Sequence, residues 1–243
     1  MRTSILLALG LVVALLAATP ARATDIDLNN IANNQTSFRL LSEDLGSVLS
    51  YRAQTPAEPL GVLGFDIGVG VTASKLQNVQ VFNQVIAPST VSSTVYVPTV
   101  SARLGLPFGF DIGAMGASVP DSNVKFFGGE LRYAIVKGGT VMPAIGLSAN
   151  MTKLTGVDQL SLDTRGIELS ISKGFAIFTP YAGIGKVWIS STPNGVPGLH
   201  NEDFSLNKGF IGLGTKILLF NINLEGDRTG EVNSYSLKVG LRF

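Results

Sequence analysis

The sequence predicts an all-β fold: a transmembrane up-and-down antiparallel β-barrel of about ten strands, preceded by a short N-terminal amphipathic helix. Apolar and polar residues alternate along most of the chain after residue 63, and a period of two is that of an extended strand. No continuous apolar stretch of about 18 residues follows the N-terminal region, which argues against membrane-spanning helices. Glycine is abundant, with 28 residues, and only 14% of residues are charged. Barrels of eight or twelve strands are the alternatives to ten.

Residues 1–23 have the features of a cleaved secretory signal peptide. Arg2 supplies the positive charge, residues 5–18 are apolar, and Ala21 and Ala23 form a small-x-small cleavage site. We therefore expect an exported protein. It has no cysteine, so its stability has to come from a core or a closed sheet rather than from disulfide bonds.

Residues 24–62 form a separate N-terminal segment in this interpretation, and residues 63–243 form the barrel. Apolar residues recur at helical spacing between Phe38 and Tyr51, which predicts a short amphipathic helix. Proline at positions 56 and 59 ends it. The helix could lie in the barrel lumen as a plug or against the periplasmic rim. The lumen is preferred, because it would cover the apolar face of the helix.

Ten segments alternate in the manner of barrel strands, separated by turns rich in Gly, Pro and Asn. They are residues 64–74, 95–106, 110–118, 124–136, 140–153, 164–172, 175–190, 206–217, 220–225 and 231–243. Longer outside loops are expected at residues 75–94, 154–163, 191–205 and 226–230. Pro98, Pro143 and Pro180 fall inside predicted strands, where each removes a ladder donor, so bulges or shifted boundaries are expected there.

The last predicted strand has the most regular pattern in the chain. One face carries apolar residues at alternate positions up to the C-terminus, and the other face is polar or small. The apolar set is Tyr235, Leu237, Val239, Leu241 and Phe243. This ending resembles the closing strand of bacterial outer-membrane β-barrel proteins. The resemblance implies that these residues are an assembly signal read by the barrel-assembly machinery and that the protein resides in the outer membrane, in contact with its lipid.

Charged residues of both signs fall on the strand face that should line the lumen. They are Asp66, Arg103, Asp111, Glu130, Arg132, Glu168, Glu225, Lys238 and Arg242. Inside a small barrel such groups have to pair or be hydrated. Two interpretations stay open at this point: a polar network that holds the barrel closed, or the lining of a narrow solute path.

Candidate catalytic chemistry is sparse. His200 is the only histidine, close to Glu202 and Asp203, and a hydrolase with a rim Ser or Asp could use it, although a solvated loop histidine is the preferred interpretation. No catalytic or phosphate-binding motif occurs, so no catalytic residue, metal site or cofactor is predicted. The net charge of +1, without a basic cluster, argues against nucleic acid as a partner.

We therefore expect a monomeric, non-enzymatic outer-membrane barrel with a narrow, polar lumen, acting as a small-solute channel or transporter or as a structural barrel. An outer-membrane lipid or peptide hydrolase and a surface binding or adhesion protein are the alternatives. Fold alone does not choose among them.

Overall fold

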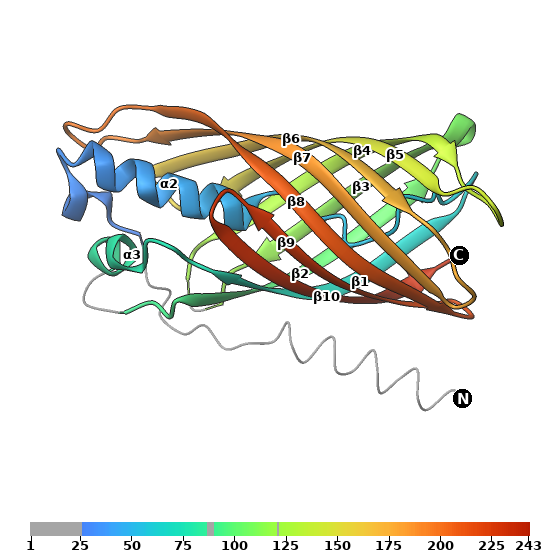
Figure 1. The fold of residues 1–243 in the computed structure, drawn as a ribbon. Helices are drawn as coiled ribbons and strands as arrows, with labels where there is room; N and C mark the ends of the chain where they lie inside the picture. The colour runs from blue at the N-terminus through green and yellow to red at the C-terminus, as the bar shows by residue number, and fades with distance from the viewer. Residues whose placement is uncertain (1–25, 87–89, 121) are drawn as a thin grey trace.

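A computed structural model describes residues 26–86, 90–120 and 122–243, and within them the chain forms a closed barrel of ten antiparallel strands (Figure 1). Each strand pairs with its sequence neighbour, and the first pairs with the last. The predicted fold and strand number are confirmed. The predicted signal peptide, residues 1–23, lies outside the described residues.

The strands are long enough to cross a membrane when tilted, since about nine to eleven residues suffice. Their bounds are β1 Phe65–Lys75, β2 Thr94–Gly105, β3 Phe110–Ser118, β4 Lys125–Lys137, β5 Ala144–Thr155, β6 Leu160–Ser172, β7 Phe178–Pro193, β8 Glu202–Ile217, β9 Phe220–Thr229 and β10 Val232–Arg242. The helices are η1 Leu28–Ile31, α2 Gln35–Leu49, α3 Val79–Val85 and the short η2 Pro107–Gly109. None of the helices in the described part of the chain has the length and apolar character needed to span a membrane.

The barrel has two unlike ends. At the end that carries Phe243, the connections are short, at residues 106–109, 138–143, 173–177 and 218–219. The opposite end carries the connection at 76–93, which contains α3 and is the longest of all. Barrels of this class keep short turns and both chain ends of the sheet on the periplasmic side, so α3 marks the outer end.

Three of the predicted outside loops are shorter than expected, because the strands continue into them. β5 and β6 are joined by residues 156–159, β7 and β8 by 194–201, and β9 and β10 by 230–231. The prediction failed there because the two strand faces exchange character: apolar residues face inward and polar residues face outward. Near the outer end, Leu162 and Ile189 point inward and are buried, while Ser161 and Ser190 point outward and are exposed.

The prolines have two explanations. Pro143 precedes β5, so its predicted strand boundary was wrong. Pro98 and Pro180 lie inside strands without a bulge at either position. Each sits one residue beyond the end of one ladder, since β2–β3 pairing begins at Thr99 and β6–β7 pairing ends at Tyr181. A missing donor is tolerated at such a ladder end.

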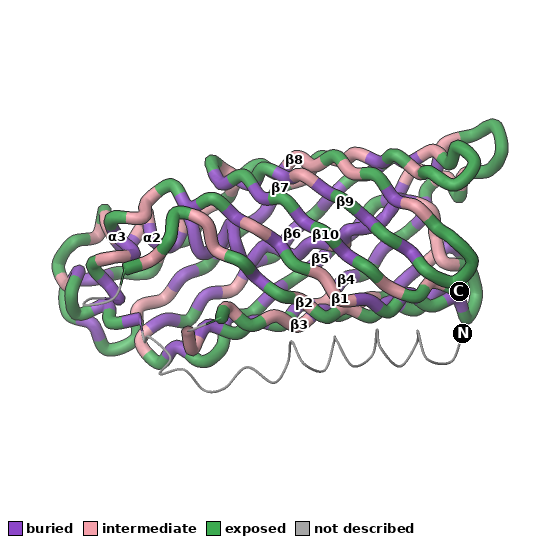
Figure 2. The backbone as a smooth tube through the Cα atoms, turned by 90° about the horizontal axis from the view of Figure 1, so that it is seen from below, coloured by how far each residue is buried: buried purple, intermediate pink, exposed green. Residues whose placement is uncertain are grey.

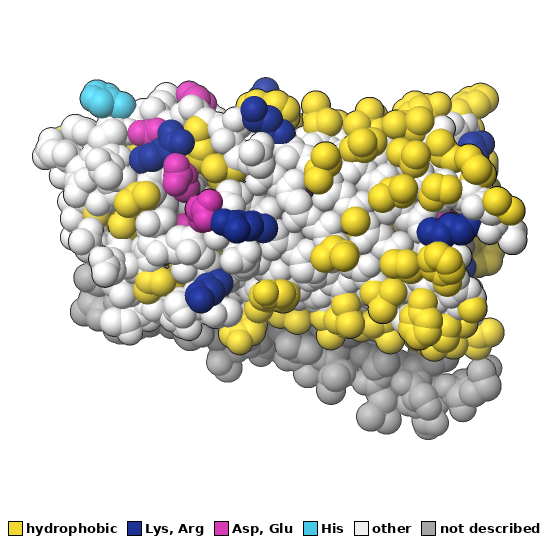
Figure 3. Space-filling model, viewed as in Figure 1, with side chains coloured by type: hydrophobic (Ala, Val, Ile, Leu, Met, Phe, Trp, Pro, Cys, Tyr) yellow, Lys and Arg dark blue, Asp and Glu magenta, His cyan; other side chains and the backbone are white. Residues whose placement is uncertain are grey.

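On the face that Figure 3 shows, apolar side chains cover the periplasmic part of the barrel, whereas the outer end is polar and charged. Exposed apolar residues occur on all ten strands, so the apolar band continues around the wall. Burial alternates residue by residue along the strands, as Figure 2 shows. In the banded part the interior is polar, so the barrel is apolar outside and polar inside. Such a wall suits a bilayer.

The interior changes character toward the outer end, where it becomes a hydrophobic core built around α2. Phe38, Leu41 and Leu49 of the helix are fully buried. They belong to one cluster with inward residues of the strands, including Leu162 and Ile189. The helix contacts β5, β6, β7, β8 and β10 and shares one buried cluster with inward strand residues, so it lies inside the barrel and not at the periplasmic rim. Its apolar face, predicted from the spacing, is buried there.

Candidate functional site

The polar residues predicted to line the lumen all lie on the inward side of the wall. Eight of them are buried, with 0–7% of their surface exposed: Asp66, Arg103, Asp111, Glu130, Arg132, Glu168, Glu225 and Lys238. The last, Arg242, is partly buried near the periplasmic end of β10. None of them is isolated, because inward residues of paired strands meet across the lumen surface.

Part of this set forms two ionic groups, one between β1 and β10 and one between β2 and β4. Lys238 Nζ lies 2.9 Å from Asp66 Oδ1. Glu130 bridges two guanidinium groups, with Arg103 at 3.2 Å and Arg132 at 3.1 Å. Each charge thus has an opposite partner, which a buried ion requires.

The inward face of β6 to β9 contains residues that the sequence reasoning missed. Lys208 Nζ pairs with Glu168 Oε1 at 2.9 Å, and the hydroxyl of Tyr181 donates to Glu225 Oε2 at 3.0 Å. Asp227 was assigned to an outside loop, yet it is 6% exposed and inward on β9. Its position two residues after Glu225 is the signal that could have placed it on the lumen face.

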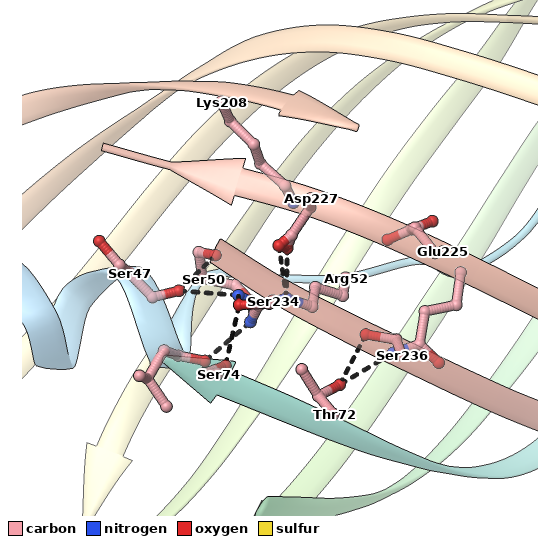
Figure 4. A network of polar contacts seen from close by, with 12 residues as sticks. Ser47, Ser50, Arg52, Thr72, Ser74, Lys208, Glu225, Asp227, Ser234 and Ser236 are labelled. Atoms are coloured by element: carbon pink, nitrogen blue, oxygen red, sulfur yellow. Dashed lines mark hydrogen bonds and ion pairs between the residues drawn. The ribbon is translucent and has the colours of Figure 1, made fainter. Parts of the chain in front are cut away.

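A segment of the chain itself occupies the lumen. Arg52, just beyond α2, donates from Nε to Asp227 Oδ1 at 2.7 Å and from Nη2 to Ser234 Oγ at 3.0 Å (Figure 4). It also donates to the carbonyl oxygens of Val48 at 2.8 Å and Ser47 at 3.1 Å, which lie at the C-terminal end of the helix. One side chain therefore caps α2 and ties it to β9 and β10.

The chain then continues through the lumen toward the periplasmic end, and the wall satisfies its polar groups. The contacts are Gln54 Nε2 to Thr72 Oγ1 (3.2 Å), Arg132 Nη1 to the Pro56 carbonyl (2.9 Å), the Ala57 N–H to Ser172 Oγ (3.1 Å), the Leu60 N–H to Asp111 Oδ1 (3.1 Å) and Arg242 Nη2 to the Glu58 carbonyl (3.2 Å). These partners come from β1, β3, β4, β6 and β10, so residues 52–60 are held from all around the barrel.

The helix is fixed at the outer end as well. The hydroxyls of Ser42 and Ser191 hydrogen-bond at 2.8 Å. Asp44 accepts from the N–H groups of Gln77 and Asn78 at 2.9 and 2.8 Å, which joins α2 to the connection that carries α3. Burial raises the pKa of Asp44, and these two N–H groups oppose that effect.

Among the residues that the structure describes, His200 at the outer rim has no hydrogen bond from its imidazole to a Ser or Asp side chain. The main chain of His200 exchanges hydrogen bonds with the Gln35 side chain, at 2.9 and 3.1 Å. Asp203 instead accepts from Ser190 at 2.6 Å. Glu202 pairs with Arg39 of α2 at 3.0 Å.

The predicted assembly strand closes the barrel. Tyr235, Leu237, Val239 and Leu241 point outward from β10 and are exposed on the barrel wall. The backbone of Phe243 exchanges two hydrogen bonds with Phe65, at 2.9 and 3.1 Å, and the two rings stack with centroids 5.6 Å apart. The last residue thus completes the seam with the first strand.

A closed ten-strand barrel with an apolar outer band and a polar interior is the architecture of bacterial outer-membrane β-barrels, and this chain is of that class. No family model and no curated protein matches the sequence.

Several solved structures are similar in fold. The attachment invasion locus protein Ail of Yersinia pestis has 12% identity and a TM-score of 0.31, over 75% of this chain and 99% of that one. The N-terminal barrel of OprF from Pseudomonas aeruginosa has 12% identity and a TM-score of 0.38, over 75% and 99%. The outer-membrane protease OmpT of Escherichia coli has 10% identity and a TM-score of 0.40, over 74% and 96%. Fold alone does not determine function, so the role has to be argued from the site.

Proposed function

We propose that the protein is a monomeric, non-enzymatic structural barrel of the outer membrane whose lumen is closed by its own N-terminal segment. The alternative of an open small-solute channel is disfavoured by the same geometry. The observation that carries the proposal is Arg52, which is buried in the lumen and joins α2 to Asp227 and Ser234 of the wall.

Both zones of the interior support a closed state. In the outer zone, α2 fills the barrel with a hydrophobic core, and a core of this kind excludes water and ions. In the membrane zone, residues 52–60 share hydrogen bonds with several strands. Ten strands also enclose a narrow interior, since eight are just filled by side chains.

The charge inventory fits a network that holds the barrel together. The buried cations of the described residues are Arg52, Arg103, Arg132, Lys208 and Lys238. Each of them lies within ion-pair distance of a buried carboxylate, namely Asp227, Glu130, Glu168 or Asp66. This pairing of every buried cation favours a network that holds the barrel closed.

Single-channel conductance in planar bilayers tests the proposal. The full chain should insert without conducting steps, because the lumen is filled. A variant lacking residues 24–59 should conduct, provided that it still migrates as a folded barrel on an unheated gel. Arg52→Met, which keeps every strand but leaves Asp227 without its partner, should conduct intermittently. Regular conductance by the full chain would overturn the proposal.

The hydrolase alternative is tested separately, with the variant His200→Ala. His200→Ala should change neither conductance nor folding, since the imidazole contacts no other catalytic type of side chain among the described residues. Hydrolysis of a lipid or peptide by the purified full chain, lost in His200→Ala, would contradict the non-enzymatic assignment.

A further inference from the structure

A shallow groove crosses the lipid-facing side of the barrel between β6 and β10. Its volume is about 820 Å³, and it is lined in part by Ala182, Ile184, Gly209, Ile211, Gly226 and Tyr235. Ile211 pairs with Ala182 on one side and with Gly226 on the other. The groove is therefore hollow because small outward residues on β7, β8 and β9 lie between larger apolar ones.

Two basic side chains lie at the outer end of this groove. Arg228 of β9 is part of its lining, and it is exposed. Lys186 of β7 is also exposed and lies two residues beyond Ile184 on the same strand face. Lys and Arg side chains gather near the boundary between the apolar band and the polar outer end (Figure 3).

Gly209 lies between these two cations. It pairs directly with Arg228 and, on the other side, with Ile184, so Lys186 is its diagonal neighbour. A Cβ atom at Gly209 would meet nothing within 4 Å, which makes this position an open notch. Arg228 already contacts Glu231. Lys186 lies over the Trp188 ring and forms no ion pair with an acidic group in the described part of the chain.

We propose that the notch and groove bind a phosphate-bearing lipid of the outer leaflet. The phosphate lies over Gly209 between Lys186 and Arg228, and an acyl chain follows the groove past Ile184 and Ile211. Cationic side chains attract anionic headgroups at a membrane surface. The groove lets an acyl chain make closer contacts than a convex wall would allow.

Trp188 provides a local probe, because it is the only tryptophan in the chain and Lys186 Nζ lies 6.0 Å from its ring centre. The full-length protein is reconstituted in phosphatidylcholine vesicles that contain a minor fraction of phosphatidic acid brominated near the carboxyl end of its acyl chains. Trp188 fluorescence should be quenched several-fold more than by brominated phosphatidylcholine at the same fraction, and high salt should remove the excess.

Two variants act on separate parts of the site. Lys186→Gln with Arg228→Gln should reduce quenching by phosphatidic acid to the level of phosphatidylcholine, and Gly209→Leu should do the same by filling the notch. Gly209 is not among the glycines with positive φ, so leucine causes no backbone strain there. Gly139→Leu is the matched control, since a Cβ at this periplasmic turn also meets nothing within 4 Å.

The control should retain the full excess quenching. Equal quenching by the two brominated lipids in the unmodified protein would overturn the proposal. So would an excess that survives the double glutamine variant, which keeps the groove and the fold but lacks the cations.

Discussion

Replacing Arg52 should release the helix from the lumen wall. Arg52→Met removes the partner of Asp227, and the two side chains are only 4% and 1% exposed. Breaking a buried ion pair by removing one member costs about 3 to 5 kcal/mol, because the other charge stays buried without compensation. The variant also loses the bonds from Arg52 to the carbonyl oxygens of Val48 and Ser47, so the C-terminal end of the helix is uncapped as well.

Amide hydrogen exchange of α2, followed by mass spectrometry on the purified barrel, measures this loss. A cost of this size corresponds to roughly 10² to 10³-fold faster exchange or more, since about 1.4 kcal/mol is a factor of ten. The added change Asp227→Leu should restore much of the protection, because an apolar pair leaves no buried charge.

Arg228→Met is the control. Arg228 and Glu231 form an exposed pair, with 57% and 78% of their side chains accessible, and such pairs contribute at most about 1 kcal/mol. The rate of amide hydrogen exchange in α2 is compared between the Arg52→Met and Arg228→Met variants. If the two rates are equal, Arg52 does not hold the helix and the reasoning is refuted.

Three further outcomes follow from the wall and the core. Deleting Phe243 should lower the amount of assembled barrel on unheated gels, because its backbone and ring close the seam; normal assembly would refute its role. Val239→Arg should lower the unfolding free energy in lipid by about 2 to 4 kcal/mol if Val239 lies near the bilayer centre. Asn233→Arg should lower it less, and equal losses for the two variants would reject the assigned depth. Gly46→Leu should destabilise the docked helix by roughly 1 to 3 kcal/mol, since an added Cβ would lie 2.5 Å from Ile189 Cδ1; unchanged exchange of α2 would show looser packing.

The sequence was informative wherever one rule governs both faces of a strand. Leu237 and Lys238 lie on opposite faces of β10 and in the predicted directions, because a bilayer outside and a polar lumen inside impose one pattern. The same rule failed near the outer end. There α2 supplies an apolar interior and water surrounds the wall, so the pattern inverts, and Leu162 was predicted to lie in a loop.

The sequence predicted the residues of the lumen site that lie on the barrel strands, but not those of the segment inside the lumen. Strand parity assigns Asp66, Glu130 and Lys238 to the interior without knowledge of their partners. The role of Arg52 could not be read in this way, because it depends on an irregular segment that crosses the barrel and meets Asp227, 175 residues later. Such long-range contacts leave no periodic pattern in the sequence from which they could be predicted. Only the apolar face of α2 indicated that this part of the chain had to be covered.

The position of α2 inside the barrel is tested most directly by a disulfide bond. The protein has no cysteine, and the hydroxyl oxygens of Ser42 and Ser191 lie 2.8 Å apart, so cysteines at both positions have the proximity that a disulfide requires. Mass spectrometry of the oxidised Ser42→Cys, Ser191→Cys protein should find the cross-linked peptide in nearly all folded barrels. The control pair Ser42→Cys, Ser190→Cys should remain reduced, because Ser190 points outward. Cross-linking of the control, or its absence in the first pair, would contradict a lumen closed by the N-terminal helix.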